Sequence, residues 1–298
     1  MIVAEGWKDY ELIDSGGGEK LERWGGVRLT RPDPQAIWPR AGSGDLWRGC
    51  DLRYHRNKSG GGYWEGQSPP SWDISYENLR FNIRPTDFKH MGLFPEQAVN
   101  WRWVMEKIKN ANRGWSDASH PARPCGREVR VLNLFGYTGG ATLACLAAGA
   151  EVTHVDAAKG INQWAKHNIK LSGLEHKKHR VLTDDCVKFV MREARRNSLY
   201  DAVIMDPPAY GRGPSGELWK LEDRLYELVS ACAGILSEQP LFMLLNIYTT
   251  GFSPAVAENI LRAVTHNRRG TVSSSEIGIA ASTGNVLLPC GFFGRWEA

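Results

Sequence analysis

The 298-residue chain contains no apolar run long enough to cross a membrane. Its longest run, residues 241–248, has the length of a strand, whereas a membrane-spanning helix needs about 18 apolar residues. The first residues also lack the basic stretch and apolar core of a secretory leader. We therefore expect a cytoplasmic protein without a membrane partner.

The cysteines show no spacing that would mark a disulfide framework or a zinc site. The chain has six of them, and no two form a C-x-x-C pair. We therefore predict no metal site and interpret the cysteines as free thiols, which are Cys50, Cys125, Cys145, Cys186, Cys232 and Cys290.

Charge of one sign is not in large excess either. The 37 Lys and Arg residues exceed the 33 Asp and Glu residues by a formal net charge of +4. Such a balance permits nucleic-acid binding without demanding it. Trp and Gly, by contrast, are abundant, with 12 and 32 residues, and six of the Trp fall within the first 72 positions. The chain is therefore not uniform along its length.

Residues 1–90 are predicted to form a small β-rich N-terminal domain. Gly-rich turn signals separate short runs in residues 10–32, and a second hairpin pattern occupies residues 71–85. Residues 38–72 are rich in Gly, Ser and Pro and indicate an extended loop. A helix is expected over residues 95–110, where a proline opens a periodic stretch.

From residue 129 onward the pattern changes to strands that alternate with helices. The expected strands are near-continuous apolar runs, and the expected helices are amphipathic. This combination predicts an α/β fold with a mostly parallel sheet covered on both faces. We assign residues 91–298 to this second domain.

Ligands of open parallel sheets bind at the carboxyl ends of the strands, so the residues that follow each strand carry the functional prediction. The first strand leads into GYTGGA, where Gly136, Gly139 and Gly140 let the backbone turn sharply and approach a ligand. A purely structural turn remains an alternative. The dinucleotide fingerprint needs Gly where Thr138 and Ala141 stand, which argues against an NAD enzyme.

Acidic residues follow the next two strands. Asp156 lies 20 residues after Gly136, and a carboxylate there can accept hydrogen bonds from a ribose diol. Asp184 and Asp185 come after the third strand, where either could accept a hydrogen bond from an adenine amine or cap the following helix. Both roles could be filled at once, one by each aspartate.

The fourth strand ends in Asp206-Pro207-Pro208-Ala209-Tyr210. Two prolines in a row stiffen the loop and supply no N–H donors, which leaves its carbonyls to face something else. A carboxylate, free carbonyls and an aromatic ring together suit a planar base. A plain stiff turn would explain the prolines but not the whole set.

Together these motifs resemble a known family. The segments VLNLFGYTGGATL, HVDAAKG, LTDD and VIMDPPAY look like motifs one to four of class I S-adenosylmethionine-dependent methyltransferases. More narrowly, the chain resembles bacterial large-subunit rRNA methyltransferases that modify cytosine C5 or guanine N7, to which residues 78–103 and 288–296 are also similar. The resemblance implies a Rossmann-like fold with a mostly parallel seven-stranded sheet, S-adenosyl-L-methionine as cofactor and RNA, specifically rRNA, as partner.

The resemblance also implies roles for individual residues. Asp156 would hold the ribose hydroxyls. Asp185, with Asp184 beside it, would hold the adenine amine. The cofactor would further be lined by Phe94, Gln97, Phe135, Gly136, Gly139, Gly140 and Asp206. The catalytic group that holds the target base would be Asp206, Pro207, Pro208 and Tyr210.

One departure from the family bears on the chemistry. Cytosine-C5 members use a cysteine nucleophile after the fifth strand, where this chain has Thr249. A hydroxyl is a far weaker nucleophile than a thiol near neutral pH. The sequence therefore favours methylation of a base nitrogen, as in the guanine-N7 members. Two alternatives stay open: a methyltransferase for a small molecule or protein, and a cofactor-binding module without catalysis.

The segment from Trp47 to Trp64 is a candidate RNA contact. It mixes basic and aromatic side chains, which suits phosphate contact and base stacking. The alternative is a solvated loop whose aromatics pack back on the core. The residues concerned are Trp47, Arg48, Arg53, Tyr54, Arg56, Lys58, Tyr63 and Trp64.

Overall fold

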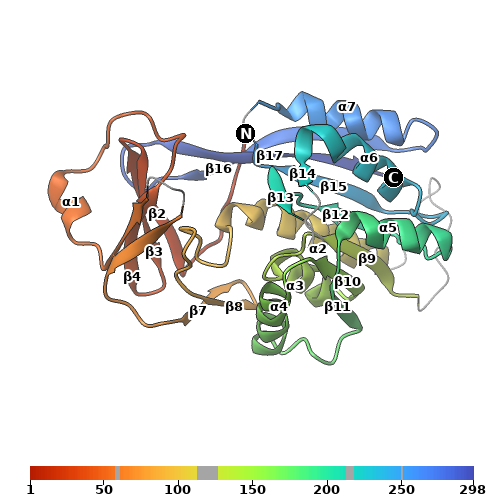
Figure 1. The fold of residues 1–298 in the computed structure, drawn as a ribbon, viewed down its shortest axis with the longest axis horizontal. Coiled ribbons are helices and arrows are strands. Elements are labelled where there is room, and N and C mark those ends of the chain that lie inside the picture. The colour runs from red at the N-terminus through yellow and green to blue at the C-terminus, as the bar shows by residue number, and fades with distance from the viewer. Residues whose placement is uncertain (58–60, 113–126, 213–217, 250) are drawn as a thin grey trace. The chain divides into compact units, whose positions relative to one another are not determined.

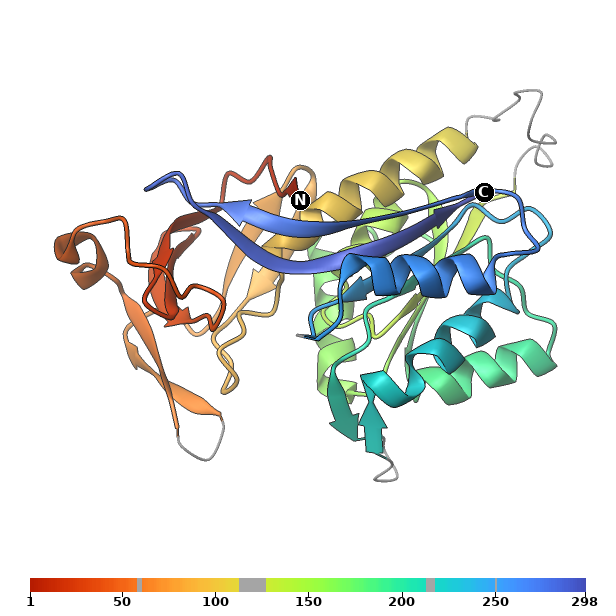
Figure 2. The ribbon, with the colours of Figure 1, turned by 90° about the horizontal axis from the view of Figure 1, so that it is seen from above.

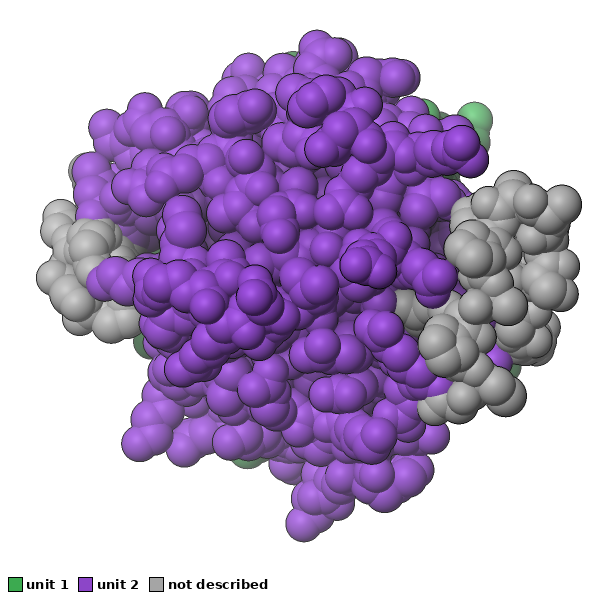
Figure 3. All heavy atoms as spheres, turned by 90° about the vertical axis from the view of Figure 1, so that its right-hand side faces the viewer, with its two compact units in different colours: residues 1–99, 277–290 green, residues 100–276, 291–298 purple. Residues whose placement is uncertain are grey.

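The computed structural model describes residues 1–57, 61–112, 127–212, 218–249 and 251–298. The chain forms two compact units, which Figure 3 colours separately. Unit 1 comprises Met1–Val99 and Ile277–Cys290, and unit 2 comprises Asn100–Glu276 and Gly291–Ala298. The chain thus returns to unit 1 late in the sequence. The division into domains at residue 90 stays a prediction.

Unit 1 is built from short strands, as expected. Five of them form a sheet in the order β2-β3-β4-β5-β6, in which only β4 and β5 run parallel. A separate hairpin joins β7 to β8 through Glu77, whose φ of 51° makes the tight turn. The bounds are β1 (Ile2–Val3), β2 (Tyr10–Gly16), β3 (Glu19–Trp24), β4 (Val27–Pro32), β7 (Trp72–Tyr76) and β8 (Leu79–Ile83).

The prediction of an extended loop over residues 38–72 is wrong in part. The segment contains the short helix α1 (Gly44–Arg48) and the antiparallel pair β5 (Leu52–Arg56) and β6 (Gly62–Gly66). Trp47 and Tyr54 are buried, and the indole N–H of Trp47 donates to Asp14 Oδ2 at 2.8 Å. These aromatic side chains anchor the segment to the core. The high Gly, Ser and Pro content of the segment suggests a loop and does not reveal this anchoring.

Unit 2 contains a mostly parallel sheet in the order β16-β17-β15-β12-β9-β10-β11, as predicted (Figure 1). β17 runs antiparallel to β15, and the five strands from β15 to β11 are parallel. An eighth strand, β1, extends the sheet by pairing with the part of β16 that belongs to unit 1. The bounds are β9 (Val129–Leu134), β10 (Ala150–Asp156), β11 (His179–Thr183), β12 (Ala202–Met205), β15 (Phe242–Ile247), β16 (Thr271–Ala280) and β17 (Leu287–Glu297).

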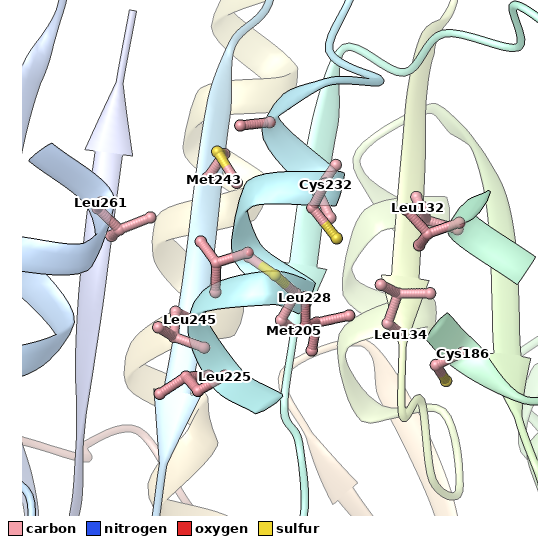
Figure 4. Close-up of a cluster of buried hydrophobic side chains, with 14 of the residues drawn as sticks. Leu132, Leu134, Cys186, Met205, Leu225, Leu228, Cys232, Met243, Leu245 and Leu261 are labelled. Carbon is pink, nitrogen blue, oxygen red and sulfur yellow. The ribbon is translucent and has the colours of Figure 1, made fainter. Parts of the chain in front are cut away.

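Helices cover both faces of this sheet (Figures 1 and 2). On one face, α5, α6 and α7 enclose a hydrophobic cluster with residues of β9, β12 and β15, including Leu134, Met205 and Leu245 (Figure 4). The opposite face carries α2, α3 and α4. The bounds are the 3-10 turn η1 (Pro95–Gln97), α2 (Ala98–Asn112), α3 (Gly140–Ala147), α4 (Lys159–Leu171), α5 (Cys186–Arg195), α6 (Leu221–Ala233) and α7 (Pro254–Val264).

A small hairpin follows β12 that the sequence did not lead us to expect. It pairs β13 (Tyr210–Arg212) with β14 (Leu218–Lys220), and Tyr210 lies opposite Lys220. Helix α6 begins directly after this hairpin, at Leu221.

Within the described ranges, no helix is long and apolar enough to cross a membrane.

Candidate active site

The register of the parallel strands brings the predicted site residues of unit 2 to one edge. Leu134 of β9 lies opposite both Val155 of β10 and Met205 of β12. The residues that follow these strands therefore emerge side by side. Asp156 in turn lies opposite Thr183 of β11, which places the acidic turn at Asp184 next to it.

The loop between β9 and α3 has an unusual backbone. Phe135, Tyr137 and Gly139 have φ values of 56°, 50° and 94°, a region that side chains rarely adopt. The Gly136 N–H donates to Val155 O at 3.1 Å, and the Gly139 N–H donates to Gly136 O at 3.0 Å. Backbone conformations of this kind persist only when the surrounding structure holds them, and they cluster at ligand sites.

Asp156 fits the role of a ribose acceptor. Its Oδ2 accepts a hydrogen bond from the Tyr137 N–H at 3.0 Å, and its Oδ1 accepts one from the Ala158 N–H at 2.9 Å. Burial raises the pKa of this carboxyl group, and the two backbone donors oppose that shift. Each carboxylate oxygen can accept more than one hydrogen bond, so the fixed carboxylate can still accept from both hydroxyls of a ribose.

The two aspartates after β11 are engaged differently. Asp185 is the N-cap of α5, where its Oδ1 accepts from the Lys188 N–H at 2.8 Å. Asp184 accepts from the Asp185 N–H at 2.9 Å with Oδ1 and forms an ion pair with Arg192 through Oδ2. Within the described part of the chain, Asp185 uses only one oxygen. It is therefore better able than Asp184 to accept a further hydrogen bond.

The proline loop is tied to the hairpin that follows it. The indole N–H of Trp219 donates to Pro208 O at 2.6 Å, and the Leu221 N–H donates to Ala209 O at 3.0 Å. These two loop carbonyls therefore each already accept one hydrogen bond from the hairpin, and each keeps a second lone pair that could face a ligand. Asp206 is partly buried at the end of β12, and Tyr210 is 57% exposed.

Trp219 is a residue of this region that the sequence analysis missed. Its ring packs against Phe135 with 5.7 Å between centroids and an interplanar angle of 46°. Because it also bonds to Pro208, it connects the glycine loop to the proline loop. Only its position, about ten residues after the DPP motif, could have pointed to Trp219. No known spacing rule marks that position as part of a site.

Two predicted cofactor residues belong to unit 1. Gln97 is buried in η1, and its N–H donates to Phe94 O at 3.1 Å. The Phe94 ring meets His90 edge-on at 5.4 Å. Their place beside the cofactor stays a prediction.

The described part of unit 2 presents no activated thiol at this edge. Cys186 lies under the glycine loop, where the Phe135 N–H points at its Sγ at 3.3 Å. Burial raises the pKa of this thiol well above its usual range, so it stays protonated and unreactive. Thr249 follows β15 in place of a cysteine. Cys125 lies outside the described residues.

The segment from Trp47 to Trp64 divides into buried and exposed side chains. Trp47 and Tyr54 are core residues, and the Trp64 indole donates to Thr86 O at 2.9 Å. Tyr63 is 57% exposed and stacks on His55. Of the basic residues, Arg48 pairs with Asp45, Arg53 pairs with Glu19 and Arg56 is exposed, whereas Lys58 lies outside the described residues.

A glycine loop, a fixed carboxylate and an acidic turn at one edge of a parallel sheet are typical of enzymes of the nucleoside-cofactor class. Comparison with known proteins makes this specific, because a model of the S-adenosylmethionine-dependent methyltransferase family matches residues 41–237. The chain belongs to this family, and its cofactor is S-adenosyl-L-methionine. The family resemblance inferred from the four motifs is thereby confirmed.

Individual relatives agree with this assignment. A crystallised S-adenosylmethionine-dependent methyltransferase from Agrobacterium tumefaciens is 38% identical, with a TM-score of 0.91 over 99% of this chain and 92% of that one. A putative methyltransferase from Streptococcus mutans shares the fold at 16% identity, with a TM-score of 0.71 over 99% of this chain and 76% of that one. The Rossmann-like methyltransferase fold is therefore confirmed.

A curated relative has a named substrate. The chain is 31% identical over 145 residues to the ribosomal RNA large subunit methyltransferase K/L of Magnetococcus marinus. The match covers 48% of this chain but only 17% of that protein.

Proposed function

We propose that the protein transfers a methyl group from S-adenosyl-L-methionine to a ring or exocyclic nitrogen of a base in ribosomal RNA. The observation that carries the proposal is the pairing of Leu134 with Met205, which sets the glycine loop and the Asp206 loop next to each other in unit 2. The resemblance to an rRNA methyltransferase supports the choice of substrate. Such a substrate would be met in the cytoplasm.

The cofactor supplies a methyl group already activated by its sulfonium. The chain's task is then to hold the cofactor and to prevent arrangements in which the methyl group does not face the accepting atom. Asp156 would accept hydrogen bonds from the ribose, Asp185 from the adenine amine, and the backbone of residues 135–140 would contact the methionine part. The oriented carboxylate of Asp156 supports this assignment.

On the substrate side, the protein must hold the accepting nitrogen in line with the methyl group at about 3 to 3.5 Å. Asp206 would accept a hydrogen bond from the base, and Tyr210 would stack on it. The rigid Pro207-Pro208 backbone, bonded to Trp219, would fix both. A nitrogen lone pair needs no covalent help from the protein, which agrees with a protonated Cys186 and with Thr249 after β15.

The test separates cofactor binding from transfer. Asp206→Ala should bind S-adenosyl-L-methionine within about threefold of the unchanged protein in calorimetry. Its transfer of labelled methyl to rRNA should fall at least 100-fold, the size of effect that one well-placed catalytic group has. Glu175→Ala, an exposed acidic residue in the turn after α4, is the matched control and should keep full activity.

Full transfer by the Asp206 variant would exclude this role for the carboxylate. Labelling of free metabolites or proteins in place of RNA would favour the alternative methyltransferase. Cofactor binding without transfer to any of the three would favour a module without catalysis.

A further inference from the structure

The glycine loop rests on a buried imidazole. A Cβ added to Gly136 would lie 2.4, 2.5 and 2.8 Å from Cε1, Nδ1 and Nε2 of His154. The backbone of Gly136 does not have the positive φ found at Gly139. A side chain at position 136 is therefore excluded by His154 and not by backbone strain.

The imidazole of His154 cannot swing aside to make room. The residue is fully buried in β10, and its Nδ1 lies 2.9 Å from Thr142 Oγ1. Asn133 Nδ2 donates to that same hydroxyl oxygen at 2.9 Å, so the Thr142 proton is directed at Nδ1. This arrangement selects the neutral ring with its proton on Nε2, and burial lowers the pKa of His154 to about 4.

The other side of the ring faces Asn162. Nε2 of His154 and Oδ1 of Asn162 are both buried, and neither makes a hydrogen bond of normal geometry within the described residues. With its proton, Nε2 of His154 is a donor, and Oδ1 of Asn162 is an acceptor. The Asn162 side chain raises the pKa of His154, against the larger lowering that burial causes. Asn162 Nδ2 donates to Asp156 O at 2.9 Å and to Thr183 Oγ1 at 2.9 Å.

We propose that His154 is a positioning residue of the cofactor site, which acts by supporting the loop backbone at Gly136 from inside the fold. The side of Gly136 that lacks a Cβ faces the imidazole, which leaves the other side of the backbone for the cofactor. The same side chain lies beside Asn162, which holds the main chain of Asp156. The proposal rests on the proposed role of residues 135–140 in binding S-adenosyl-L-methionine.

The experiment is a suppressor test with the full-length protein, read by calorimetric titration with S-adenosyl-L-methionine. Gly136→Ala should weaken cofactor binding at least tenfold, because the new methyl group displaces the loop from the imidazole. His154→Ala removes the obstacle, so the double variant should bind at least fivefold more tightly than Gly136→Ala alone. A double variant that stays folded and binds no better than Gly136→Ala would overturn the proposal.

Gly140 provides a matched control at the other end of the loop. A Cβ there would lie 2.6 Å from Cζ2 of Trp101, so Gly140→Ala should also weaken binding. His154→Ala should not rescue this variant, and rescue of both glycines would show a general loosening that contradicts the proposal.

Thermal unfolding of each variant identifies any that fail to fold. His154→Asn, which is smaller than histidine and keeps a polar partner for Thr142, replaces His154→Ala if the alanine variant does not fold. Failure of the unchanged protein to bind the cofactor would refute the proposed function of the loop. Normal binding by the unchanged protein without rescue would refute only the role of His154.

Discussion

At the scale of single residues, the three glycines of the loop between β9 and α3 meet three different constraints. Gly139 adopts a φ of 94° that other residues rarely tolerate, whereas Gly136 and Gly140 make room for His154 and Trp101. The sequence identified all three from one pattern but assigned them one common role. Their separate roles depend on neighbours that come from other elements, which a local pattern does not reveal.

Asp156 gives a residue-scale prediction about cofactor affinity. Asp156→Asn should raise the Kd for S-adenosyl-L-methionine about 10-fold to 100-fold, because hydrogen bonds to a charged acceptor contribute about 1.5–3 kcal/mol. Asp184→Asn is the comparison and should change the Kd less, since that carboxylate already pairs with Arg192. Calorimetric titration measures both, and a larger effect at Asp184 would reverse the assignment.

His154 gives a residue-scale prediction about pH. Its pKa is lowered from 6.5 to about 4 in the folded protein, so folding favours the neutral ring. The stability that this provides is complete above pH 6.5 and declines as the pH falls toward 4, by up to about 3 kcal/mol. His90 in unit 1 is shifted in the same direction and adds its own decline.

The share of His154 is isolated by comparison with His154→Asn. Urea unfolding at pH 7 and pH 5 should show a smaller loss of stability in the variant than in the unchanged protein. Equal losses would mean that the imidazole titrates in the folded state as it does in the unfolded chain.

At the scale of elements, apolar strands and amphipathic helices were predictable, whereas four short strands of mixed polarity were not. β9, β10, β12 and β15 are near-continuous apolar runs whose period and length identify them. β5, β6, β13 and β14 have only three to five residues each and include glycine or charged positions. These strands form because they pair with other strands, and a local sequence pattern does not show which strands will pair.

The β13–β14 hairpin supports a prediction about transfer. Trp219→Ala removes both the bond to Pro208 and the packing against Phe135, so the rate of transfer to RNA should fall about tenfold or more. Cofactor affinity should change less, because Asp156 and Asp185 are untouched. Steady-state kinetics with Tyr226→Ala, an exposed aromatic residue of α6, as control would check this. Equal transfer rates for the two variants would show that Trp219 is not part of the active site.

The β5–β6 hairpin supports a prediction about RNA binding. Arg56→Gln should reduce the slope of log K against log salt by about 0.7 to 0.9, the loss of one phosphate contact. Tyr63→Ala should weaken binding without changing that slope, since stacking releases no counterions. Arg269→Gln, an exposed residue of unit 2, serves as the control. An unchanged slope for Arg56→Gln together with unchanged affinity for Tyr63→Ala would place the RNA contact elsewhere.

At the scale of the whole molecule, the family and the parallel sheet followed from four strand-end motifs, because each motif lies where a parallel sheet presents its ligand edge. The sequence did not predict that residues 277–290 return to unit 1. Both β16 and β17 continue from one unit into the other, and nothing in their alternating pattern marks the crossing point.

The central claim is that this molecule methylates a nitrogen of an RNA base. It is tested most directly by mass spectrometry of nucleosides, after the purified protein has been incubated with deuterium-methyl S-adenosyl-L-methionine and rRNA from a strain that lacks the gene. The account predicts one deuterated nucleoside with its methyl group on nitrogen. A label on cytosine C5, or none in RNA, would contradict it.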